Sequence, residues 1–203
     1  TEKIATEGRP SGTTMNAARS GPSAVPKFPP SWNSDCAVPN RPPEAMRATG
    51  AAAGSFDAGM AQVSSRIGAR LLGFNVTAVP PGMAAFPFHS HRANEELFFV
   101  LQGRGVVRIG RETYPIRPGD FIACPPGGPE TAHQIRNTGG EELRYVAIST
   151  LLYPELAEYP DSGKFGVYAR VPGAPPGSPG EFRYVGRESS ATGYWDGEGD
   201  SAT

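Results

Sequence analysis

Apolar residues recur at every second position in a stretch that begins near residue 70. The first such run contains Leu72, Phe74, Val76 and Ala78, and this period of two is that of a β-strand. Further short runs of the same kind follow at about 84–91, 95–102, 105–110, 112–117, 120–124, 131–137 and 142–150. Glycine- and proline-containing turns separate them, and no long helical period interrupts them. The pattern predicts an all-β domain, a sandwich or barrel of antiparallel strands.

The run at 96–101 carries apolar side chains on both of its faces. Its residues alternate between the two faces, and all of them except Glu96 are apolar. A strand of an isolated barrel usually turns one polar face to water. We therefore expect a covering segment or a second copy of the chain over the outer face, and we favour a homodimer.

Proline divides the chain into three parts. Eight of the 22 prolines fall in residues 1–43 and five in residues 160–203. This distribution predicts an extended N-terminal segment over 1–43, of which 1 to about 24 is a flexible tail. The barrel is expected over 44–159, with one helical turn at 45–48 and a short helix or strap at 151–156. Residues 160–203 are expected to be loop-rich and to dock on the barrel or on a partner subunit.

Charge and cysteine content narrow the class of protein. Lys plus Arg number 19 and Asp plus Glu number 20, which disfavours a nucleic-acid or anionic-membrane binder. No apolar run approaches the roughly 18 residues of a membrane span. The two cysteines, Cys36 and Cys124, form neither a disulfide framework nor a CxxC pair, so we expect a cytoplasmic protein. Cys124 lies in an apolar run and is expected to be a buried core residue.

The chain has three histidines, and two of them are two residues apart. On a strand, His89 and His91 would point to the same side, where neutral imidazoles can bind a metal ion. Ordinary surface or core histidines are the alternative for such a pair. The third histidine is His133.

Two sequence motifs around these histidines resemble those of the cupin superfamily. The first runs from Gly82 to Gly103 and contains His89, His91 and Glu96, with six residues instead of the usual five after its first glycine. The second contains Pro125-Pro126-Gly127, His133 and Asn137, with five residues instead of two between Gly127 and His133. The resemblance covers about residues 70–150. It implies a jelly-roll-like barrel, the double-stranded β-helix, with one divalent metal ion held by His89, His91, Glu96 and His133.

Glu95 competes with Glu96 for the carboxylate position. Glu96 is five residues from His91, so on one unbroken strand the two side chains would face opposite ways. A turn through residues 92–94 would reset the direction and place Glu96 beside the histidines. Without that turn, Glu95 would be the ligand. We favour Glu96, which also has the motif's distance to Gly103.

Three imidazoles and a carboxylate suit Fe, Mn, Ni, Co or Zn as divalent ions. Such a site carries a net positive charge and favours an anionic small-molecule substrate. Candidate substrate-binding residues are Phe86 and Phe88, next to the first ligands, and Arg108. Packing within the barrel and an ordinary surface arginine are the alternatives for them. The favoured function is an Fe(II)-type dioxygenase. The alternatives are a redox-neutral isomerase or lyase acting on a sugar or keto acid, and a non-catalytic small-ligand or sugar-binding protein.

Overall fold

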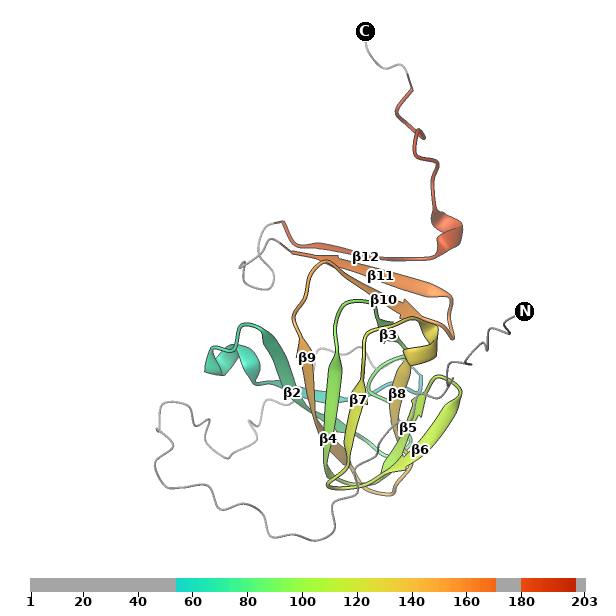
Figure 1. Ribbon diagram of the computed structural model, residues 1–203. Helices are drawn as coiled ribbons and strands as arrows, with labels where there is room; N and C mark the ends of the chain where they lie inside the picture. The colour runs from blue at the N-terminus through green and yellow to red at the C-terminus, as the bar shows by residue number, and fades with distance from the viewer. Residues whose placement is uncertain (1–53, 171–179, 200–203) are drawn as a thin grey trace, which may run out of the picture.

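A computed structural model describes residues 54–170 and 180–199, which form an antiparallel β-structure (Figure 1). Its strands are β1 Gly59–Gln62, β2 Leu72–Val79, β3 Ser90–His91, β4 Glu96–Gln102, β5 Gly105–Ile109, β6 Glu112–Ile116, β7 Phe121–Cys124, β8 His133–Asn137, β9 Leu143–Thr150, β10 Glu155–Tyr159, β11 Lys164–Ala169 and β12 Phe182–Gly186. Three short 3₁₀ turns accompany them: η2 Ser64–Ile67, η3 Pro129–Thr131 and η4 Glu188–Ser190. The described residues contain no α-helix, and no helix among them is long and apolar enough to cross a membrane.

The strands form the two walls of a jelly-roll barrel. One wall is a five-stranded sheet in the order β1-β2-β9-β4-β7. The other consists of the three strands β6-β5-β8 and the four strands β12-β11-β10-β3. A single β-bridge between His89 and His133 joins these two groups. The predicted all-β, cupin-type barrel is therefore confirmed.

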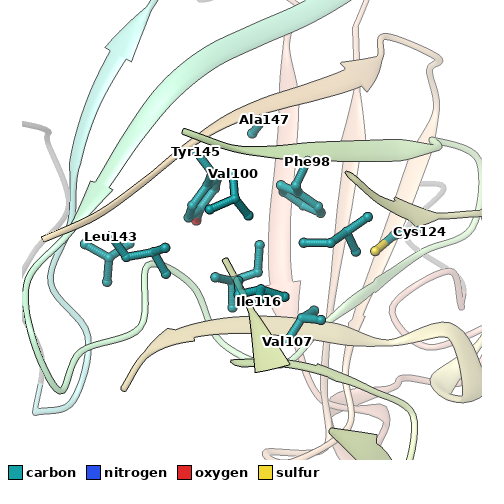
Figure 2. Packing of buried hydrophobic residues seen from close by; sticks show 11 residues of the cluster. Phe98, Val100, Val107, Ile116, Cys124, Leu143, Tyr145 and Ala147 are labelled. Carbon is teal, nitrogen blue, oxygen red and sulfur yellow. The ribbon is translucent and has the colours of Figure 1, made fainter. Parts of the chain in front are cut away.

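The core lies between the two walls and follows the alternation of the sequence. Phe98, Val100 and Tyr145 come from the five-stranded sheet and meet Val107 and Ile116 from the opposite wall (Figure 2). Each fully buried large apolar side chain contributes on the order of 1.5–3 kcal/mol to stability. The same cluster includes Cys124, whose predicted burial is confirmed.

The outer face of the five-stranded sheet is also apolar. On β4 and β7, the rings of Phe99 and Phe121 lie 4.4 Å apart between centroids, and Phe121 remains 58% exposed. Leu101 and Leu72 on the same face are 45% and 46% exposed. The structure therefore places the second apolar face of β4 where the sequence predicts it, and the homodimer remains a prediction.

Two elements differ from the sequence-based expectation. Within the predicted strand 84–91 only residues 90–91 form a strand, with single bridges at Ala84 and His89. Pro87 interrupts this run, since proline cannot donate a ladder hydrogen bond. Residues 151–156 do not form the expected short helix: they are irregular up to Glu155, where β10 begins.

The C-terminal part holds more regular structure than expected. Residues 160–203 were expected to be loop-rich, but β11 and β12 lie within them, and β11 pairs with β10. The expected domain boundary at 159 thus falls between two paired strands. The glycines and prolines around these strands conceal their short alternating patterns. The predictions for 1–43 and for the helical turn at 45–48, as well as Cys36, lie outside the described residues.

Candidate metal centre

The three histidines come from two neighbouring segments of one wall. The backbone amide of His89 donates to the carbonyl of His133 at 3.1 Å, and the amide of His133 donates back at 2.7 Å. His91 follows two residues later in β3. This pairing holds the first motif against the start of β8. Residues separated by some 40 positions in the chain therefore present their rings together.

The imidazoles gather around one oxygen of Glu96. The Oε2 atom of Glu96 lies 2.9 Å from Nε2 of His133, 3.5 Å from Nε2 of His91 and 3.8 Å from Nε2 of His89. Candidate ligand atoms of His89, His91 and Glu96 all lie within 4.8 Å of one another. The structure thus brings together all four residues that the cupin resemblance implies as ligands.

A turn through residues 92–94 separates His91 from β4 and decides between the two glutamates. Glu96 turns inward to the histidines, whereas Glu95 is exposed. The backbone amide of Glu95 donates to the hydroxyl of Thr150 at 3.0 Å. The change of direction that the sequence analysis requires is therefore present, and it selects Glu96.

Glu155, at the start of β10, holds this turn. Its carboxylate accepts backbone hydrogen bonds from Arg92 at 3.0 Å, Ala93 at 3.3 Å and Asn94 at 2.9 Å. The side-chain amide of Asn94 also donates to it. Glu155 is only 5% exposed, and its Oε2 atom lies 3.8 Å from Nδ1 of His91. No sequence signal points to Glu155, because it lies about 60 residues beyond the turn and outside both motifs.

The charges of the site depend on its burial and its close contacts. Burial alone would raise the pKa of Glu96, but His133 and His91 hold it well below its usual range. Burial and the neighbouring His133 lower the pKa of His89 to about 4. Burial also works against the charged form of His91, but the carboxylates of Glu155 and Glu96 raise its pKa to about 9. The site therefore combines an ionised carboxylate with a neutral imidazole at His89.

These residues fit a divalent metal ion. Three ring nitrogens and a carboxylate oxygen converge from the His89–His91 segment, β8 and β4, and this donor set suits first-row transition metals. The Nδ1 atom of His91 has no hydrogen-bond partner among the described residues, and Glu155 is the nearby carboxylate that can fix its tautomer. Among the described residues, His89, His91 and Glu96 form a possible metal-binding group, with His133 directly beside them.

The predicted substrate-binding residues lie in two places. The ring of Phe86 is 6.2 Å from that of His89 and is partly exposed, so it borders the site. Phe88 is buried, and the guanidinium of Arg108 lies over its ring at 3.6 Å. Arg108 also pairs with Asp161 at 2.8 Å and alternates with the inward-facing Val107. The structure thus brings Phe86 to the histidines. Phe88 and Arg108 instead contact each other, on the face of β5 opposite to the inward-facing Val107.

Comparisons with known proteins match this fold and site. The family model described as "Cupin domain" matches residues 75–149. The oxalate-binding protein of Thermotoga maritima is 32% identical over 74 residues, which are 36% of this chain and 58% of that protein. The matched segments span little more than half the length of the first curated relatives, 54% in a protein of Methanocaldococcus jannaschii.

Two solved structures align over a longer part of the chain. One, described as a candidate sugar phosphate isomerase of Acidithiobacillus ferrooxidans, has a TM-score of 0.56 at 26% identity. The alignment covers 66% of this chain and 79% of that one. The other is described as a sugar phosphate isomerase of Silicibacter pomeroyi and has a TM-score of 0.58 at 21% identity. Here 68% of this chain and 82% of the other are covered.

Proposed function

Because the chain belongs to the cupin superfamily, we propose that it is a metal-dependent, redox-neutral isomerase of a phosphorylated sugar. The observation that carries the proposal is the convergence of three imidazole nitrogens on the Glu96 carboxylate. The likeness to the Acidithiobacillus ferrooxidans structure supports the substrate class, since it extends over two thirds of this chain.

His89, His91, Glu96 and His133 would hold the metal ion. When bound, such an ion supplies a Lewis acid that polarises a carbonyl or hydroxyl oxygen of the substrate. The chain itself supplies the walls of the site. The ring of Tyr159 lies 6.2 Å from that of His89, nearly parallel to it, and the ring of Phe86 lies at the same distance from His89. These aromatic side chains limit the space beside His89. The hydroxyl of Tyr159 is a hydrogen-bond donor that can reach a substrate oxygen, and burial raises its pKa further above neutral pH.

A small-ligand binding protein is the second candidate function. It is supported by the oxalate-binding relative from Thermotoga maritima. The dioxygenase favoured by the sequence analysis stays a prediction, and none of the compared proteins named above is described as an oxygenase. The redox-neutral alternative is therefore the better supported one. The bound ion would be divalent Fe, Mn, Ni, Co or Zn.

The test is to incubate the metal-loaded protein with a panel of aldose and ketose phosphates, with and without oxygen. NMR monitors the conversion of each sugar phosphate. The proposal predicts interconversion that is independent of oxygen and is lost in His91→Ala. A reaction that requires oxygen would support the dioxygenase. Thermal stabilisation by a ligand without turnover would support the binding protein.

The homodimer is also a proposal. It is supported by the exposed apolar residues on the outer face of the five-stranded sheet, which include Leu72, Leu101 and Phe121. Sheets in proteins commonly bury such faces against another sheet. A second copy of this chain offers the same face and could pack against it with twofold symmetry.

A further inference from the structure

Strands β10, β11 and β12 continue one wall of the barrel beyond β3, the strand that ends at His91 (Figure 1). Paired residues in adjacent strands lie on the same face of a sheet. His91 pairs with Ala157, which is two residues from Tyr159. Tyr159 pairs with Lys164, and Tyr168 of β11 pairs with Arg183 of β12. The register therefore places Tyr159, Lys164, Tyr168 and Arg183 on the face that carries His91.

Contacts connect these side chains to the candidate metal centre. The ring of Tyr159 lies 6.2 Å from the ring of His89, with an angle of 24° between the planes. The hydroxyls of Tyr159 and Tyr168 are 3.2 Å apart. The ammonium of Lys164 is 5.7 Å from the Tyr159 ring centroid, and the guanidinium of Arg183 is 5.4 Å from that of Tyr168. A continuous row of side chains thus leads from His89 to two cations.

Gly166 makes this arrangement possible. A Cβ atom at this position would lie 2.9 Å from the Tyr168 hydroxyl oxygen and 3.0 Å from its ring. Tyr168 therefore lies across its own strand, over Gly166, and reaches the hydroxyl of Tyr159. A larger residue at 166 would displace the Tyr168 ring.

Lys164 and Arg183 are among the basic residues that have no carboxylate partner in the described part of the chain. Arg92, Arg108 and Arg144 each pair with a carboxylate within 3 Å. Within residues 54–170 and 180–199, no ion pair involves Lys164 or Arg183. Two positive charges near the rings of two tyrosines whose hydroxyls lie 3.2 Å apart are a suitable environment for an anion. Charge-assisted hydrogen bonds to phosphate or carboxylate are strong.

We propose that Tyr159, Lys164, Tyr168 and Arg183 form a subsite for the anionic group of the substrate, a phosphate or a carboxylate. The remainder of the substrate then reaches the histidines along Tyr159. This assignment rests on the proposed function, because it requires that the substrate also occupies the histidine centre. The subsite would orient an extended substrate and leave the metal-binding residues free for its reacting end.

Calorimetric titration with inorganic phosphate and with acetate tests the subsite directly. The subsite predicts that the metal-loaded protein binds at least one of the two anions and that the same binding persists in His91→Ala. The double variant Lys164→Gln/Arg183→Gln should weaken it by about tenfold or more. The matched control Arg108→Gln, which removes a cation already paired with Asp161, should change it less than twofold. The anion that binds more tightly identifies the group.

Tyr159→Phe and Tyr168→Phe keep the rings and remove the hydroxyls, and each should weaken anion binding while the thermal unfolding temperature stays close to wild type. The subsite is overturned if neither anion binds the wild type, or if the double variant binds as tightly as Arg108→Gln. Binding that follows these predictions in a protein without isomerase activity would support the subsite and refute only the proposed function. Isomerase activity with an unchanged KM in the double variant would support the proposed function and refute the subsite.

Discussion

The Nδ1 atom of His91 lies 3.8 Å from Oε2 of Glu155, while Nε2 of the same ring lies 3.5 Å from Oε2 of Glu96. One imidazole is thus placed between two carboxylates, one at the candidate metal centre and one behind it. Glu155 also accepts the amides of the 92–94 turn. The side chain that holds the turn after His91 therefore also faces the His91 ring.

Replacing Glu155 by Gln should weaken metal binding. Gln keeps the shape but removes the negative charge that faces Nδ1 of His91. Loss of a partner behind a metal-binding histidine typically reduces metal affinity by about 10- to 100-fold. Competition with a colorimetric chelator measures the effect. The matched control is Glu158→Gln, which removes a partly exposed ion pair with Arg92 and should leave the affinity nearly unchanged. Equal losses in the two variants would argue against a positioning role for Glu155.

The two adjacent glutamates allow a direct test of the ligand assignment. Glu96→Ala removes the carboxylate on which the imidazoles converge, and we expect the purified protein to lose most of its bound metal. Glu95→Ala changes an exposed side chain and should retain the metal. Metal content of both variants, measured by mass spectrometry, distinguishes them. Retention in Glu96→Ala together with loss in Glu95→Ala would reverse the assignment.

Cys124 should be unreactive in the folded protein. Burial raises the pKa of its thiol, and the nearby Glu96 charge adds to this, so the thiol stays protonated at pH 8. In a Cys36→Ser background, iodoacetamide at pH 8 should modify Cys124 slowly in buffer and rapidly in guanidinium chloride. Rapid modification of the native protein would show that this part of the core is accessible.

The proposed homodimer predicts a particle of twice the chain mass in light scattering coupled to gel filtration. Phe121→Lys places a charge on the apolar outer face and should shift the protein towards the monomer. Leu152→Lys replaces another exposed apolar side chain, at 54% exposure, and serves as the control. A monomeric wild type, or a dimer unaffected by Phe121→Lys, would mean that this face is not the interface.

The sequence was sufficient to predict the barrel strands and the four converging residues, because alternation and motif spacing are local features. His89 and His91 share a side as their spacing predicts, and the parity argument correctly required the 92–94 turn. Glu155 was out of reach, because the turn and the carboxylate that holds it are joined only by the fold. The same is true of Tyr159, which comes near His89 only through the pairing of β3 with β10.

Arg108, in contrast, was predicted from the sequence to bind substrate, and the structure does not bring it to the histidines. Its position near the motifs suggested a role at the site, but sequence proximity does not determine which face of β5 it occupies. In the structure, the Arg108 guanidinium lies over the Phe88 ring and pairs with the Asp161 carboxylate. Strands β11 and β12 were missed because their alternating patterns are short and lie among glycines and prolines, and their pairing with β10 depends on long-range contacts.

We propose that His89, His91, Glu96 and His133 together bind one divalent metal ion. The most direct measurement is the metal content per chain after loading and removal of excess ion, for the wild type and for His91→Ala, with folding checked by circular dichroism. We expect about one ion per wild-type chain and a large loss in the folded variant. A folded wild type that binds no ion under any loading condition would contradict it.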